Sequence, residues 1–163
     1  MSGEYTMTLT TNWLGGSPFN NRPMFFACVA KPDGTGYWQA RNDGQIWSFG
    51  TAELYSTDDT HRDWVVAMKT TQSGEGYYTL DITGKIIAYG DAVHYGDLVS
   101  NDKNVLDMAL TPSGEGYWML KSNGEVIEFG DATDHGDDTP TGELPSGVDV
   151  TCHAIESHPS LDG

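Results

Sequence analysis

Residues 116–136 read GYWMLKSNGEVIEFGDATDHG, and the chain contains two further copies of this framework. The copies begin at Gly36, Gly76 and Gly116, so they start 40 residues apart. An aromatic–glycine pair near the end of each copy keeps the same spacing: Phe49-Gly50, Tyr89-Gly90 and Phe129-Gly130. A unit this short cannot bury its own apolar faces, so neighbouring units must stack to form a core. A period of about 40 to 45 residues is typical of the blades of a β-propeller.

Each unit contains three segments with the pattern of β-strands. The first is apolar, the second begins with aromatic residues and then alternates in polarity, and the third is apolar on both of its faces. A glycine turn separates the second segment from the third: Asp43-Gly44, Thr83-Gly84 and Asn123-Gly124. Asn-Gly and Asp-Gly pairs in such a place are a strong short-range hairpin signal. The predicted strands are 25–29, 37–41 and 46–49 in the first unit, 65–68, 77–81 and 86–89 in the second, and 105–110, 117–121 and 126–129 in the third.

The sequence therefore predicts one all-β domain over residues 1–163, a propeller-like array of antiparallel blades with three or four strands each. The predicted units are an N-terminal partial repeat (1–23), three full repeats (24–63, 64–103 and 104–143) and a C-terminal partial repeat (144–163). Propellers need about four or more blades to close, and an unclosed array exposes sheet edges. Either the two ends meet in an incomplete fourth blade, or other subunits complete the array; we expect an assembly partner.

The chain is strongly acidic. Asp and Glu total 24 against 8 Lys and Arg, which gives a formal charge of -16 and a pI near 4.3. Such a charge repels phosphate backbones and anionic membrane surfaces, so we expect neither nucleic acid nor membrane as a partner. It fits either general solubility or a high-salt habitat, where dense carboxylates stay hydrated and their repulsion is screened. No apolar run approaches the ~20 residues of a transmembrane helix, and the N-terminus lacks the pattern of a signal peptide.

The two cysteines, Cys28 and Cys152, lie far apart and have no metal-binding or redox spacing. We expect both to be buried strand residues, because Cys28 takes the repeat position of Met68 and Met108. A bridge between Cys28 and Cys152 stays open if the chain ends meet.

The repeated run GYWxxxxxGxxxxFGDAxxYG, seen at 116–136 and more loosely at 36–55 and 76–96, resembles tandem repeats of bacterial surface proteins and of phage tail or other virion proteins. The resemblance covers about 70 per cent of the chain. It implies a β-propeller or propeller-like fold used for structure and attachment. It implies no catalytic residue that could be transferred to this chain.

Acidic and histidine side chains gather in the loops that close the second and third repeats. Their residue types could hold a cation, but their spacing matches no calcium or zinc motif, so we interpret them as solvated turns and predict no metal site and no cofactor. No nucleophile elbow, P-loop or zinc-protease motif is present either, so we predict no catalytic residues and no enzyme. The loop residues concerned are Asp91, His94, Asp97, Asp131, Asp134, His135 and Asp137.

Aromatic residues divide into those that recur and those that break the repeat. Trp38, Tyr78 and Trp118 occupy one repeat position, and we expect them to pack in the core. Residues that differ between copies are better candidates for contact with a partner or receptor, because a scaffold keeps packing positions and diversifies its loops. These candidates are Trp13, Tyr55, His94, Tyr95 and His135.

The leading functional hypothesis is a non-enzymatic virion structural protein, a capsid decoration, tail or fibre component that serves as a rigid docking and display module. Its expected partners are other virion structural proteins or copies of itself. The alternative is a carbohydrate- or host-receptor-binding module of a phage or cell surface. A propeller hydrolase or lyase is the third class, because such folds also host enzymes.

Overall fold

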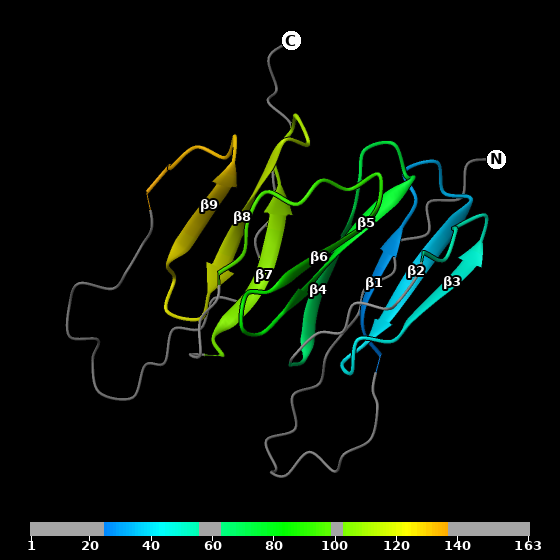
Figure 1. Ribbon diagram of the computed structural model, residues 1–163, viewed down its shortest axis with the longest axis horizontal. Coiled ribbons are helices and arrows are strands. Elements are labelled where there is room, and N and C mark those ends of the chain that lie inside the picture. The colour runs from blue at the N-terminus through cyan, green and yellow to red at the C-terminus, as the bar shows by residue number, and fades with distance from the viewer. Residues whose placement is uncertain (1–24, 56–62, 99–102, 137–163) are drawn as a thin grey trace, which may run out of the picture.

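The computed structural model describes residues 25–55, 63–98 and 103–136. All the regular structure in these residues is strand, arranged as three separate sheets that stand side by side (Figure 1). The strands are β1 (Phe25–Ala30), β2 (Gly36–Arg41), β3 (Ile46–Gly50), β4 (Val65–Thr70), β5 (Gly76–Asp81), β6 (Ile86–Gly90), β7 (Val105–Leu110), β8 (Gly116–Lys121) and β9 (Val126–Gly130).

Each sheet is an antiparallel meander of three strands, which we call a blade: β1–β3 form blade 1, β4–β6 blade 2 and β7–β9 blade 3. The hairpin between the second and third strands turns on a glycine with positive φ, as at Gly84 (φ 89°), a conformation that costs glycine little. The first strand contains a β-bulge at the same place in each blade. In blade 2 the bulge lies between Val65 and Ala67, and it lets Val65 and Met68 face the same neighbouring blade.

The core consists of two clusters between blades. The first joins blades 1 and 2, and the second joins blades 2 and 3 at corresponding repeat positions. In both junctions the first strands lie next to each other, β1 beside β4 and β4 beside β7. The buried members of the first cluster are Trp38, Ala40, Ile46, Ala52, Val65, Met68, Tyr77, Ile87 and Tyr89. Those of the second are Ala67, Tyr78, Leu80, Ile86, Val105, Met108, Tyr117 and Met119.

Backbone hydrogen bonds also connect successive blades. The amide of Val65 donates to the carbonyl of Asn42 (3.2 Å), and the amide of Val105 donates to the carbonyl of Ile82 (3.1 Å). Both bonds run from the first residue of one blade to the residue that follows the second strand of the preceding blade. The repeat therefore extends beyond the blades themselves to the way they are joined.

The predicted fold class is confirmed: the chain is an all-β, propeller-like array of about 40-residue antiparallel blades. The described blades each have three strands, and their ring is not closed by the described residues. The three sheets lie within 24–63, 64–103 and 104–143, whereas the partial repeats at 1–23 and 144–163 lie outside the described residues. In the described part of the chain, no helix is long and apolar enough to cross a membrane.

The expectation of a buried Cys28 needs correction. Cys28 lies in β1 as a free thiol that is only half-buried, whereas Met68 and Met108 at the same repeat position are buried. The reason is that Cys28 is on the side of blade 1 that no described blade covers. Partial burial nevertheless raises the pKa of the Cys28 thiol, although a hydrogen bond with Gln39 opposes the shift. Cys152 lies outside the described residues.

Candidate functional site: the closing loops and the junction between blades 2 and 3

The loop that closes each blade is held by an aromatic side chain of the second strand. The indole Nε1 of Trp38 donates to the carbonyl of Glu53 (2.8 Å), and that of Trp118 donates to the carbonyl of Thr133 (2.9 Å). In blade 2 the hydroxyl of Tyr78 contacts Val93 twice, donating to its carbonyl and accepting from its amide, both at 3.1 Å. In all three copies the bond spans 15 residues, so one recurrent position fixes the loop backbone.

Packing agrees with the core role expected for this aromatic position in two of its three copies. Trp38 and Tyr78 are buried between blades. Trp118 makes the same loop contact but is only half-buried, because no described blade follows blade 3.

The fixed loop backbone presents a row of exposed side chains, two per blade, which we call the loop row: Glu53 and Leu54, Val93 and His94, Thr133 and Asp134. Leu54 is 51% exposed and Val93 54%, so both present apolar surface to solvent. The chemistry of the row differs from blade to blade, although its backbone is held in the same way. This combination suits a contact surface that is defined by side chains on a rigid frame.

Tyr55 and Tyr95, both predicted partner contacts, lie where successive blades meet. The hydroxyl of Tyr55 donates to the carbonyl of Glu75 in blade 2 (2.6 Å), and its ring lies 5.9 Å from that of Tyr77. Tyr95 repeats the ring contact with Tyr117 of blade 3, also at 5.9 Å. The structure thus gives these two residues a role in joining blades, and their contact with an external partner stays a prediction.

His135 takes the same repeat position as these tyrosines, at the end of the stack. It is exposed, and its ring lies 6.1 Å from that of Trp118 in its own blade. Of the other predicted contacts, Trp13 lies outside the described residues.

His94 belongs to a short local network. Its Nε2 lies 2.7 Å from Oδ1 of Asp97, and the same carboxylate oxygen accepts the amide of Ile86 (2.9 Å). Asp97 thereby ties the closing loop of blade 2 to the start of β6. Among the described residues, no group of three or more His, Cys, Asp or Glu side chains is arranged to hold a metal ion.

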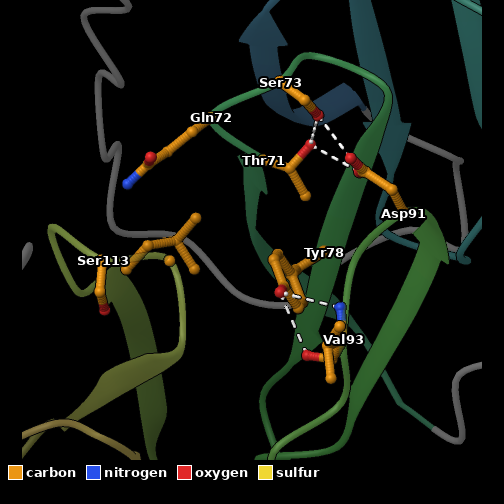
Figure 2. A pocket seen from close by; sticks show the side chains of 9 residues that line it. Thr71, Gln72, Ser73, Tyr78, Asp91, Val93 and Ser113 are labelled. Carbon is orange, nitrogen blue, oxygen red and sulfur yellow. Dashed lines mark hydrogen bonds between the residues drawn. The ribbon is translucent and has the colours of Figure 1, made fainter.

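In repeats 2 and 3, the aspartate that follows the aromatic–glycine pair clamps the turn between the first and second strands. In blade 2, Oδ1 of Asp91 accepts the hydroxyl of Thr71 (2.8 Å) and Oδ2 accepts that of Ser73 (2.5 Å), as Figure 2 shows. In blade 3, Asp131 accepts the hydroxyls of Thr111 and Ser113 at the same distances. These bonds, with that of Ser113 contributing most, lower the pKa of Asp131 from its usual 3.8.

Blade 1 achieves the same connection with different residues. Thr51 takes the place of the aspartate, and its hydroxyl pairs with that of Thr35. The carboxylate is in the turn instead: Oδ1 of Asp33 accepts both the amide (2.9 Å) and the hydroxyl (2.8 Å) of Thr35. Sequence analysis missed this clamp. The signal was available, because the Thr-x-Ser turn and the aspartate after the aromatic–glycine pair are both present in repeats 2 and 3 and both absent from repeat 1.

A pocket of about 180 Å³ opens between blades 2 and 3, beside the Asp91 clamp of blade 2 (Figure 2). Its wall combines hydroxyl groups, one carboxylate and apolar side chains, so it can offer hydrogen bonds and apolar contact to a small polar group. One of these hydroxyls, that of Ser73, already donates a hydrogen bond to the carboxylate of Asp91. The lining residues are Thr71, Gln72, Ser73, Tyr78, Asp91, Val93, Leu110, Ser113 and Gly114.

Tyr117 locks the same junction from within. Its hydroxyl donates to the carbonyl of Gly96 (2.6 Å) and accepts the amide of Tyr95 (3.1 Å), so it holds the closing loop of blade 2 against blade 3. Burial raises the pKa of Tyr117 to about 12, although both hydrogen bonds oppose the shift.

Comparison with known proteins bears on the fold. No family model matches the sequence, and no curated protein sequence is similar to it. Among solved structures, the chain is similar to the β-propeller domain of Cps50 (Swd1) from Myceliophteria thermophila, with a TM-score of 0.54 and 15% identity. The match covers 85% of this chain and 48% of that one, so the chain spans about half the length of the propeller domain that it resembles. The described blades therefore form part of a β-propeller-like architecture.

Proposed function

We propose that this protein is a non-enzymatic docking and display module of the β-propeller type, and that it serves as a structural component of a virion: a capsid decoration, tail or fibre protein. The observation that supports the docking role most directly is the loop row. Its backbone is held by Trp38, Tyr78 and Trp118 in the same way in each blade, while its exposed side chains differ. The virion assignment comes from the resemblance of the FGDA repeat to phage tail and virion repeats.

Several polar and ionisable side chains near the loop row make hydrogen bonds that stabilise the blades. Asp91 and Asp131 clamp turns, Asp97 ties a loop to a strand, and Tyr117 joins two blades. The frame is thereby stiff close to the loop row, which limits the entropy that docking would otherwise cost. The exposed apolar side chains Leu54 and Val93 supply contact area in the closing loops of two successive blades.

The docking role is tested by replacing these two side chains with charged ones. The double variant Leu54→Glu/Val93→Glu should keep the unfolding midpoint of the wild type within about 1–2 °C, because surface changes away from packed sites have small effects. The measurement is incorporation of tagged protein into particles produced by the natural host culture, read by quantitative mass spectrometry of purified particles. We expect wild-type protein in the particles at a fixed ratio and a loss of at least about tenfold for the variant, as hot-spot residues show.

A matched control changes charge without touching the loop row. Glu115 is exposed in the turn between β7 and β8, so Glu115→Gln should leave incorporation unchanged. Wild-type protein absent from the particles would contradict the virion role. Equal incorporation of both variants would contradict docking through the loop row.

The pocket between blades 2 and 3 favours a second candidate, a carbohydrate- or receptor-binding module. Its mixture of hydroxyl, carboxylate and apolar groups is the kind of surface that binds a sugar ring. A glycan array distinguishes the two: binding that disappears in Gln72→Ala and Val93→Glu, but not in Leu54→Glu, would favour the sugar-binding function over protein docking.

A further inference from the structure

The two end faces of the blade stack carry residues whose counterparts inside the stack are buried. Residues paired across neighbouring strands share a face of the sheet, and Tyr37 pairs with Phe49 on the outer side of blade 1. Their rings stack at 4.7 Å. The same pair in blade 2, Tyr77 and Tyr89, stacks at 4.8 Å and lies against blade 1. Phe49 is 40% exposed, whereas Tyr89 is 6% exposed, so the pair is preserved at this end but no described blade covers it.

The opposite end shows the complementary face. Trp118 pairs with Glu128 on the outer side of blade 3. The residues at the Trp118 position in blades 1 and 2 are Trp38 and Tyr78, which are buried against the next blade. Trp118 stays half-buried because no described blade follows.

Every junction inside the stack joins one face of each type. A donor face, which carries Trp38 or Tyr78, packs on an acceptor face, which carries the Tyr77–Tyr89 or Tyr117–Phe129 pair. Blade 3 ends in a donor face, and blade 1 begins with an acceptor face, that no described blade covers. The chain therefore displays the two halves of one more junction of a kind that it already forms twice.

We propose that two copies of this chain associate head to tail, with the donor face of blade 3 in each copy packed on the acceptor face of blade 1 in the other. Two such junctions close the assembly into a ring. A closed ring has no uncovered face left, which limits it to two copies when each copy spans half of the circle. The match to about half of a propeller domain indicates an arc of this extent.

Charge at the two faces agrees with this order. The guanidinium of Arg41 lies over the ring of Trp47 on the acceptor face of blade 1, at 5.4 Å from the ring centre, and is also paired with Asp43. The donor face of blade 3 carries the acidic Glu128. Since Arg41 is already paired with Asp43, this difference in charge between the two faces makes only a small contribution to the head-to-tail order.

His135 supplies a further sign that this end is built to join another blade. In the inner junctions its counterparts Tyr55 and Tyr95 reach into the next blade, where each contacts the buried tyrosine of the acceptor face. In the proposed ring, His135 would reach Tyr37 of the second copy. A histidine can fill this position but lacks the reach of the tyrosine hydroxyl that bonds Glu75 in the first junction.

The test is the mass of the purified full chain by sedimentation velocity and native mass spectrometry over a range of protein and salt concentrations. We expect a species of about 35 kDa, twice the chain mass of 17.7 kDa. Each copy carries a formal charge of -16, so the copies repel one another, and association should strengthen as salt rises from about 0.1 M to about 1 M.

Variants of each face should give single chains. Phe49→Glu places a carboxylate on the acceptor face, and Trp118→Arg removes the indole of the donor face. Each should raise the dimer dissociation constant at least about a hundredfold, since both changes remove a central aromatic contact. Leu54→Glu is the control, because Leu54 is exposed in the loop row and lies on neither face; it should dimerise normally. Circular dichroism should show the same strand content in all variants.

Mixing the two defective variants tests the head-to-tail order. The Phe49→Glu chain keeps an intact donor face and the Trp118→Arg chain keeps an intact acceptor face, so together they can form one good junction. We expect a mixed dimer that neither variant forms alone. The intact junction covers the acceptor face of the Trp118→Arg chain, and Cys28 lies on that face. Alkylation of Cys28 in this chain, isotopically labelled to mark its peptide, should therefore slow when the mixed dimer forms, whereas that of the Phe49→Glu chain should not.

His135→Tyr restores the residue type of the inner junctions and should tighten the dimer by about tenfold, the effect of roughly one additional ring contact or hydrogen bond. Three outcomes would overturn the proposal: a single-chain mass at every salt concentration, a dimer unaffected by either face variant, or defective variants that fail to rescue each other. None of these outcomes bears on the loop row, so the proposed docking role would stand or fall separately.

Discussion

The ring of Trp38 lies 5.0 Å from the ring of Tyr77, across the boundary between the first and second blades. Tyr78 and Tyr117 repeat this relationship at 5.8 Å across the next boundary. At each of the two described junctions, an aromatic side chain of the earlier blade thus packs on a tyrosine of the later one. The stability of the stack should depend on these contacts far more than on the same residue types at its ends.

Tyr77→Ala should therefore lower the free energy of unfolding by about 3–5 kcal/mol, the usual effect of removing a large aromatic side chain from a core. Tyr37→Ala, at the same repeat position on the outer face of blade 1, should cost much less, because Tyr37 is only half-buried. Urea unfolding followed by tryptophan fluorescence measures both. The protein should be dilute enough to keep single chains in solution, and equal losses for the two variants would contradict the stacking order.

The clamp of blade 3 should make stability depend on acid pH. Hydrogen bonds from Ser113 and Thr111 lower the folded-state pKa of Asp131 below its usual 3.8. A group with a lowered folded-state pKa stabilises the protein at pH values above its unfolded-state pKa, and this contribution disappears as pH falls through the folded-state pKa. Asp131→Asn should therefore be less stable than the wild type at pH 6–7, and the difference should shrink below about pH 4.

Ser113→Ala provides the matched control for that experiment. It removes the hydrogen bond that contributes most to the lowered pKa but leaves the carboxylate in place. The urea midpoint of this variant should lie between those of the wild type and Asp131→Asn at neutral pH and should show a weaker dependence on acid. A difference between wild type and Asp131→Asn that stays constant down to pH 3 would show that the charge of Asp131 does not contribute.

Tyr117 should make the stability of the protein depend on alkaline pH. Burial raises its folded-state pKa from 10.0 to about 12. A raised folded-state pKa gives stability that is complete below the unfolded-state pKa and is lost as pH rises through the folded-state value. The wild type should therefore lose stability between about pH 10 and pH 12, and the absorbance of tyrosinate should show a group that ionises late.

Tyr117→Phe removes the hydroxyl and leaves the carbonyl of Gly96 and the amide of Tyr95 without this partner. It should lower stability by about 1–2 kcal/mol at pH 7, the usual effect of a lost buried hydrogen bond. Its alkaline decline should be shallower, although some decline should persist because burial also raises the pKa of Tyr77. An alkaline decline identical to that of the wild type would mean that Tyr117 ionises without penalty.

Gly96 should be intolerant of substitution for a reason that its counterpart Gly136 does not share. Both have positive φ, but a Cβ at Gly96 would lie 2.6 Å from the ring of Phe129, whereas one at Gly136 would meet nothing within 4 Å. Gly136→Ala should cost about 1 kcal/mol from backbone strain alone. Gly96→Ala should cost about 1–3 kcal/mol more, from overpacking against blade 3. Thermal unfolding of the two variants gives the comparison, and equal losses would exclude the contact with Phe129.

Much of the fold could be predicted because each strand carries its own signals. The hairpin glycines and the aromatic starts of the second strands placed all nine strands within one or two residues of their observed bounds. The bulge in the first strand could not be predicted, because it reverses which residues share a face without changing composition: Val65 and Met68 are three apart and still face the same blade. The loop clamp was also missed, since Asp91 and Thr71 are 20 residues apart and only folding brings their oxygens together.

The candidate site, too, could be predicted from the sequence only in part. The variable loop positions were visible in the sequence, but that Tyr55 and Tyr95 bridge blades became apparent only from Tyr55's bond to Glu75 and the packing of Tyr95 on Tyr117. Sequence variation marks a position that is free to differ between copies. It does not distinguish a residue that contacts a partner from one that adapts to the next blade.

The sequence by itself determined that three equivalent meanders exist and that both faces of each are apolar, because alternation and turn chemistry act within about 40 residues. Only the tertiary structure decided which copies of a repeated residue are buried. Tyr37, Tyr77 and Tyr117 are the same residue at the same repeat position, yet Tyr77 and Tyr117 are buried and Tyr37 is not. The physical reason is that a strand sets the direction of its side chains, whereas their removal from water depends on whether another blade lies in that direction.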